Sequence, residues 1–157
     1  MKDTSLPFRI GVGIILINKK NKIFVGKRKD HPNNNKWQMP QGGVNAGEDY
    51  VAAMKRELQE ETSVKSFEIL KEFDDWTQYE LPDYLKGKIW KGKFRGQKQK
   101  WFLLKFTGSD NEINLKTKYP EFIDWKWVNP EIIPNIIVDF KRKLYEELLT
   151  KIKPFID

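Results

Sequence analysis

The sequence predicts an α+β fold with a mixed β-sheet between helices, and two observations lead to this prediction. Near the N-terminus, residues 9–17 and 22–28 have the apolar, β-branched character of two strands joined by a polar turn. Residues 49–62 and 136–151 instead carry apolar residues at the three- and four-residue steps typical of amphipathic helices. Because these elements fit within 157 residues, we expect one domain spanning residues 1–157.

The first part of the chain alternates short extended segments with polar loops. The strand at residues 9–17 ends at the turn 18–21, Asn-Lys-Lys-Asn, before the strand at 22–28. An asparagine-rich loop at 30–36 follows, and residues 37–40 form a short extended segment before the glycines. The apolar run is too short to span a membrane and lacks a signal-peptide cleavage pattern, so we expect a cytoplasmic protein.

The helix expected at residues 49–62 has one apolar side. At about 100° per residue, one arc is expected to face the core, and it carries Val51, Met54, Leu58 and Thr62. Glycines precede this helix, so the sequence predicts a turn that leads directly into it.

The second part of the chain predicts three more strands and a final helix. The strands are expected at residues 69–79, 99–106 and 122–128, with a long loop at 81–98. The final helix, at 136–151, is expected to bury an apolar stripe formed by Ile137, Phe140, Leu144, Leu148 and Ile152.

Composition restricts the chemistry. The chain contains no cysteine and a single histidine, His31, so thiol nucleophiles, thiolate-bound zinc and a Ser-His triad are excluded or disfavoured. Any metal must be a hard cation held by oxygen, which means magnesium, manganese or calcium. The net charge of +7 around a local group of glutamates suits a polyanionic substrate, although a generally lysine-rich composition explains the charge equally well.

Three glutamates are predicted to share one side of the helix at residues 49–62. Glu57, Glu60 and Glu61 stand at i, i+3 and i+4, so their carboxylates repel one another. Glu61 also borders the apolar arc, where an unpaired charge is costly, and Arg56 is expected to face mainly Glu60. Bound cations are the natural compensation, and a simple solvated acidic face is the alternative.

Residues 42–64 resemble the Nudix box, G-x5-E-x7-R-E-U-x-E-E-x-G-U, where U is aliphatic. The matching identities are Gly42, Glu48, Arg56, Glu57, Glu60 and Glu61. The one departure is Ser63, which stands where the pattern has the glycine that closes the helix in a left-handed turn. The resemblance implies an α/β/α sandwich and a hydrolase that cleaves a phosphoanhydride bond by attack of water on phosphorus.

The same resemblance implies roles for individual residues. Gly42 and Gly43 shape the loop before the helix, and Glu48 pairs with Arg56 to fix it. The predicted metal-binding and catalytic residues are Glu57, Glu60, Glu61 and Glu121. They would bind Mg²⁺ or Mn²⁺, two or more ions, and either Glu61 or Glu121 would accept the proton of the attacking water.

Segments outside the box resemble a subfamily, the bacterial RNA pyrophosphohydrolases and the related dinucleoside polyphosphate hydrolases. These segments are residues 37–43, 95–103, 120–122 and 125–128, and the similarity extends from Arg9 to Tyr145. The implied phosphate- and RNA-binding residues are Arg9, Arg28, Tyr79, Lys98, Gln99, Phe140 and Lys141. Phe140 fits a core position equally well, and Phe140 and Lys141 are expected on exposed turns of the last helix.

Residues 81–100 are strongly basic and contain two interleaved aromatic residues, Trp90 and Phe94. This composition is typical of a guide for an RNA backbone, and a solvated flexible loop is the alternative. The basic residues are Lys86, Lys88, Lys91, Lys93, Arg95, Lys98 and Lys100.

Three functions remain open from the sequence. The favoured one is removal of pyrophosphate from the 5′-triphosphate end of RNA, or of phosphate from a 5′-diphosphate end, which leaves 5′-monophosphate RNA and promotes RNA decay. The second is hydrolysis of dinucleoside polyphosphates such as diadenosine tetraphosphate or pentaphosphate. The third is a non-catalytic module that only binds RNA or nucleotides, which retention of every box glutamate disfavours. Neither a membrane nor DNA is expected as a partner, and a monomer is the default.

Overall fold

The structure is a computed structural model, and it describes residues 5–29 and 36–156. Its centre is one sheet whose strands are β1 (Phe8–Ile17), β2 (Ile23–Arg28), β3 (Gln41–Gly43), β4 (Phe67–Glu72), β5 (Thr77–Glu80), β6 (Gly96–Phe106) and β7 (Phe122–Val128). The main order is β4-β6-β1-β2-β7, with β3 paired to β1 and β5 paired to β6. The β1–β6 pair is parallel and the others are antiparallel, so the predicted mixed sheet is confirmed.

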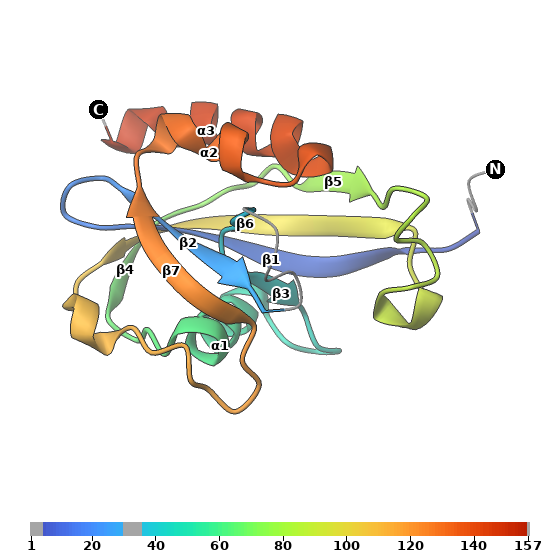
Figure 1. Ribbon diagram of the computed structural model, residues 1–157, viewed down its shortest axis with the longest axis horizontal. Coiled ribbons are helices and arrows are strands. Elements are labelled where there is room, and N and C mark those ends of the chain that lie inside the picture. The colour runs from blue at the N-terminus through green and yellow to red at the C-terminus, as the bar shows by residue number, and fades with distance from the viewer. Residues whose placement is uncertain (1–4, 30–35, 157) are drawn as a thin grey trace.

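Helices cover both faces of this sheet (Figure 1). Helix α1 (Tyr50–Thr62) lies on one face, and α2 (Ile133–Ile136) with α3 (Arg142–Ile156) lies on the other. Each face has its own apolar core, because side chains alternate along β1 between the two sides. Ile14 and Leu16 pack with α1, whereas Ile15 and Ile17 pack with α3. The arrangement is the expected α/β/α sandwich.

Helix α1 closely matches its prediction. Asp49 caps its N-terminus by accepting a hydrogen bond from the Ala52 N–H, and Met54 and Leu58 are fully buried. At the other end Ser63 adopts the left-handed conformation, with φ of 67°, which the box pattern usually assigns to glycine. The Ser63 hydroxyl donates to the Asn114 carbonyl at 2.7 Å, so the serine is held by a contact that glycine lacks.

The strand predicted at residues 69–79 is wrong, because the chain bends at Asp74–Asp75. The bend divides it into β4 and β5, which pair with different halves of β6. Pairing with β5 also extends β6 back to Gly96, so the predicted loop is shorter than expected and contains a 3₁₀ turn, η1 (Trp90–Gly92).

The single helix predicted at residues 136–151 is also wrong at its start. Ile137 and Val138 are extended, which separates α2 from a 3₁₀ turn, η4 (Asp139–Lys141), that leads into α3. This break turns Lys141 inward, so it is 5% exposed instead of lying on an exposed turn. The apolar stripe of Leu144, Leu148 and Ile152 is buried as predicted.

The asparagine-rich loop, including His31, lies almost entirely at residues 30–35, outside the described residues. Every helix within the described residues is too short or too polar to cross a membrane.

Candidate active site

The acidic side of α1 meets the glycines of β3. Strand β3 pairs with β1 through Gly11 and Gly43, and this places Gly42 directly beside the helix. A Cβ atom on Gly42 would lie 2.0 Å from the carboxyl carbon of Glu57. Only glycine therefore leaves room for that carboxylate at this point, which explains physically why the turn requires it.

Arg56 organises the start of the site. Its Nε and Nη2 donate to the two carboxylate oxygens of Glu48, both at 2.9 Å, and Nη2 also donates to the Gly43 carbonyl at 2.8 Å. The Arg56 guanidinium lowers the pKa of Glu48 to about 2. The expected Glu48–Arg56 pair is therefore present, and it ties the glycine loop to the helix.

Arg56 also contacts two of the predicted metal ligands. Its Nη1 lies 2.7 Å from Glu57 Oε1 and 3.3 Å from Glu60 Oε2. It therefore faces Glu48 and Glu57 more closely than Glu60, which differs from the sequence expectation. Among the described residues, no three acidic or histidine side chains converge closely enough in this conformation to hold one ion.

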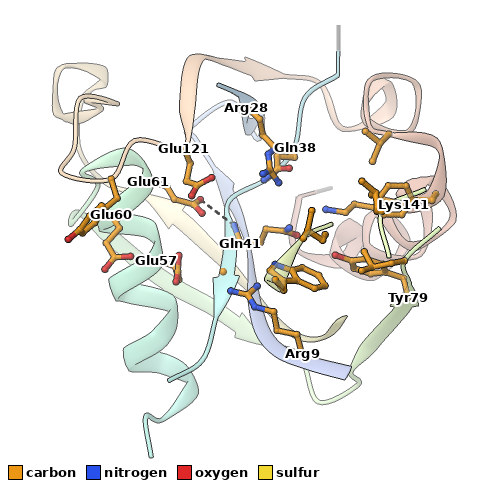
Figure 2. Close-up of a pocket in the computed structure, with 18 of the residues that line it drawn as sticks. Arg9, Arg28, Gln38, Gln41, Glu57, Glu60, Glu61, Tyr79, Glu121 and Lys141 are labelled. Carbon is orange, nitrogen blue, oxygen red and sulfur yellow. Dashed lines mark hydrogen bonds between the residues drawn. The ribbon is translucent and has the colours of Figure 1, made fainter. Parts of the chain in front are cut away.

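Glu61 is the most deeply buried carboxylate of the site, at 4% exposed. Burial raises its pKa well above the ordinary value, and the nearby Glu57 and Glu121 carboxylates raise it further. Its Oε2 accepts a hydrogen bond from the Gln41 N–H at 3.3 Å. Figure 2 shows Glu61 and Glu121 adjacent, so residues from α1 and from the segment before β7 meet here.

These carboxylates form one side of a cavity of about 650 Å³. The opposite side is cationic and aromatic, and Figure 2 shows Lys141 and Tyr79 there, with Arg9 and Arg28 between the two sides. The cavity lining contains these predicted site residues: Arg9, Arg28, Gly42, Glu57, Glu60, Glu61, Tyr79, Glu121, Phe140 and Lys141. With cations bound at the carboxylate end, such a cavity is suited to a ligand that carries both phosphates and a base.

Burial governs the ionisation of the cationic end. It lowers the pKa of Lys141 to about 7, and the nearby Arg28 charge lowers it further. The Lys141 ammonium lies 5.4 Å from the centre of the Tyr79 ring, and the Tyr79 ring is 5.8 Å from that of Phe140. Phe140 is thus a cavity-lining residue as well as part of the packing.

Two predicted binding residues lie outside the cavity lining. Gln99 is buried and donates from Nε2 to Gln41 Oε1 at 2.9 Å, so it supports a lining residue. Lys98 lies elsewhere: its ammonium is 5.3 Å from the centre of the Trp76 ring, which packs edge-on against Tyr50 of α1. Side chains alternate in direction along β6, so the consecutive residues Lys98 and Gln99 point to opposite faces of the sheet.

Sequence reasoning missed several residues of the cavity. Gln38 and Gln41 belong to a segment that carried the subfamily resemblance, and Tyr119 is two residues before Glu121, so motif proximity was an available signal. The remaining lining residues are Val138 and five residues of the basic loop, which the sequence predicts to guide RNA without assigning them to the cavity. They are Leu81, Tyr84, Leu85, Ile89, Trp90 and Val138.

The chain belongs to the NUDIX domain family, whose model matches residues 7–148. A curated relative from Pelagibacter ubique named RNA pyrophosphohydrolase is 55% identical over 153 residues, which cover 98% of this chain and 96% of the relative. One with the same name from Rhodospirillum rubrum is 47% identical over 155 residues, covering 99% and 93%.

Solved structures show the same fold at low sequence identity. The dihydroneopterin triphosphate pyrophosphohydrolase of E. coli has a TM-score of 0.68 at 17% identity, covering 92% of this chain and 99% of that one. An Ap4A hydrolase from C. elegans has a TM-score of 0.66 at 23% identity, covering 96% and 99%. These two likenesses establish the fold.

Proposed function

We propose that this protein removes pyrophosphate from the 5′-triphosphate end of RNA, or phosphate from a 5′-diphosphate end, and leaves a monophosphate. The observation that carries the proposal is a cavity with carboxylates at one end and cations, including the buried Lys141, with aromatic rings at the other. The near full-length similarity to proteins named RNA pyrophosphohydrolase supports it. Location in the cytoplasm, and action as a monomer, are parts of the same proposal.

The acidic end fits Mg²⁺ or Mn²⁺. Glu57, Glu60, Glu61 and Glu121 offer only carboxylate oxygens, the donors that hard cations prefer. The space left by Gly42 accommodates the Glu57 carboxylate, and the raised pKa of buried Glu61 shows that this carboxylate gains from a nearby positive charge. Two or more bound ions would supply charge neutralisation and an activated water.

The carboxylates must change partners to bind such ions. Glu57 and Glu60 both contact Arg56 Nη1, whereas Arg56 keeps three further hydrogen bonds to Glu48 and the Gly43 carbonyl. Release of Glu57 and Glu60 therefore leaves the arginine anchored. Glu48 and Arg56 hold the loop, while Glu57 and Glu60 are available to move.

Proton transfer is assigned to one of two adjacent carboxylates. Glu61 or Glu121 accepts the proton of the attacking water, and both line the cavity at the point where α1 and the segment before β7 meet. Burial and the neighbouring carboxylates raise the pKa of Glu61, so its ionised form is a stronger base than an ordinary glutamate.

The cationic end binds the RNA. Arg9, Arg28 and Lys141 line the cavity and are proposed to contact phosphates, and Tyr79 with Phe140 offers aromatic surface to a base. Gln99 supports the cavity lining through its hydrogen bond to Gln41. Lys98, which lies beside Trp76, is proposed to contact the RNA chain outside the cavity.

A comparison of substrates tests the proposal. The experiment measures kcat/KM of the purified protein with magnesium for 5′-triphosphorylated RNA and for diadenosine tetraphosphate. The proposal predicts preference for RNA. A hundredfold preference for the dinucleotide would assign the protein to dinucleoside polyphosphates, and binding of either substrate without turnover would indicate a non-catalytic module.

The basic loop provides a second test. Lys88, Lys91 and Lys93 are exposed, so their joint replacement by alanine removes charge without disturbing the core. We expect weaker turnover of RNA, with a reduced dependence on salt, and unchanged turnover of diadenosine tetraphosphate. Equal losses on both substrates would show that the loop does not guide RNA.

A further inference from the structure

Arg9 of β1 lies between the backbone of β3 and an indole ring. A Cβ atom on Gly43 would lie 2.5 Å from Arg9 Nη2, so the guanidinium passes close against the β3 backbone. The Arg9 guanidinium also faces the indole, because Arg9 Cζ is 5.1 Å from the centre of the Trp90 ring, within the range of a cation–π interaction. Both Arg9 and Trp90 line the cavity.

The backbone that carries Trp90 is strained. Trp90 and Lys91 are consecutive non-glycine residues in the left-handed region, with φ of 51° and 56°, and Gly92 follows with φ of 68°. Large side chains rarely adopt this conformation, and it persists where the surrounding structure determines it and often where function uses it. Here it directs the indole onto Arg9, while Phe94 packs edge-on against the same ring at 6.1 Å.

The loop that presents Trp90 is fixed to the strand that presents Arg9. Its two ends are joined by a hydrogen bond from the Leu81 N–H to the Arg95 carbonyl at 2.9 Å. The Arg95 N–H donates to the Pro7 carbonyl at 3.0 Å, and Arg95 Cζ lies 4.9 Å from the centre of the Phe8 ring. An ion pair between Arg95 and Glu80 further links the two ends of the loop. The loop that presents Trp90 is therefore fixed at the start of β1, close to Arg9.

We infer that Trp90 is a positioning residue that holds the Arg9 guanidinium in the cavity, ready to bind a phosphate of the substrate. An arginine side chain loses considerable rotamer freedom when it binds, and stacking on a fixed ring removes part of that loss beforehand. Arg9 is the cation that this arrangement places beside Glu57, at the boundary between the carboxylate end and the aromatic end. The role assigned to the phosphate rests on the proposed function.

A double-mutant cycle on turnover of 5′-triphosphorylated RNA tests the inference. Trp90→Leu is expected to lower kcat/KM about tenfold, in line with a partly desolvated cation–π contact, and to have no further effect in an Arg9→Ala background. Trp90→Tyr keeps an aromatic ring, so it is expected to retain most of the wild-type kcat/KM. Phe155→Leu, at an exposed ring on α3 outside the cavity lining, is the matched control, and its kcat/KM should stay within about twofold of wild type, as is usual away from a binding contact.

A separate readout does not depend on activity. In the wild-type protein the Arg9 Nε–H proton is expected to show a ring-current shift in the NMR spectrum, which Trp90→Leu abolishes and Phe155→Leu retains. An unchanged Arg9 signal in Trp90→Leu would overturn the inference. So would an undiminished effect of Trp90→Leu in the Arg9→Ala background, which would show that Trp90 contacts the substrate itself. If the wild type hydrolyses neither RNA nor diadenosine tetraphosphate, the proposed function fails and the NMR result still decides the positioning role.

Discussion

Gly42 and Glu57 are packed so closely that any side chain at position 42 would occupy the place of the Glu57 carboxylate. The distance from an added Cβ to the Glu57 carboxyl carbon is 2.0 Å. The conflicting atom is the far end of a flexible side chain, so the carboxylate can swing away while the backbone stays in place. Glycine at this position thus protects the geometry of the site more than the stability of the fold.

Gly42→Ala is therefore expected to lower kcat/KM by about 100-fold, the scale of a 1 Å displacement at a reacting centre. Its melting temperature should remain close to that of wild type. Gly47→Ala is the matched control: Gly47 has φ of 77° and nothing within 4 Å of an added Cβ. That variant should lose about 1 kcal/mol of stability through backbone strain and keep most of its activity. Similar activity losses in both variants would contradict the account.

The Glu48–Arg56 pair makes the free energy of unfolding depend on pH in the acidic range. The Arg56 guanidinium lowers the pKa of Glu48 from 4.5 to about 2 in the folded protein. Because the folded pKa lies below the unfolded one, this contribution is fully present above about pH 4.5 and is lost as pH falls toward about 2. Glu48→Gln should flatten the decrease in unfolding free energy over that window.

Denaturant unfolding at several pH values between 2 and 6 measures this effect. Glu147→Gln, a change of the same type at an exposed position on α3, serves as the control. If Glu48→Gln and wild type lose stability in parallel as the pH falls, the pair does not act as described.

Ser63 combines an unfavourable backbone with a favourable contact. Ser63→Ala keeps the left-handed φ of 67° and loses the hydrogen bond to the Asn114 carbonyl, so it should destabilise the protein by about 1 kcal/mol. Ser63→Gly loses the same bond and relieves the strain, so its net change should stay below about 1 kcal/mol. Chemical denaturation of the two variants checks their order, and a more stable alanine variant would contradict this explanation.

Buried Lys141 makes the free energy of unfolding depend on pH in the alkaline range. Burial lowers its pKa to about 7, against 10.5 for the ordinary side chain. Between those values the unfolded chain binds more protons, so this residue makes stability increase as pH rises from 7 to 10.5. Lys141→Met should therefore be more stable than wild type at pH 7, and its advantage should shrink toward pH 10. Thermal unfolding at the two pH values measures it, and a constant difference would argue against a buried, titrating lysine.

The sequence predicted well those elements whose signals are local. Helix α1 has its apolar spacing and its Asp49 cap within one short segment, and Ser63 occupies the predicted left-handed position. The bend at Asp74–Asp75 and the extended break at Ile137–Val138 arise from pairing and packing with distant segments. Periodicity within a window carries no information about such contacts.

The same distinction applies to the candidate site. The carboxylates of the box were predictable because one helix determines their relative positions, and folding brings Glu121 to them as expected. Lys98 shows the limit: one residue of strand register decides whether it faces the cavity or Trp76. Trp90 reaches Arg9 only through a loop conformation with left-handed residues, which the sequence did not indicate.

The central claim is that the carboxylates of α1 bind divalent cations that promote cleavage of the 5′-triphosphate of RNA. Its most direct test is the initial rate of pyrophosphate release from 5′-triphosphorylated RNA, with magnesium and with chelator, for wild type and for Glu61→Gln. We expect no release in chelator and a loss of about 10²–10⁴-fold in the variant, with the fold unchanged by circular dichroism. Release that persists in chelator, or a variant with wild-type turnover, would contradict it.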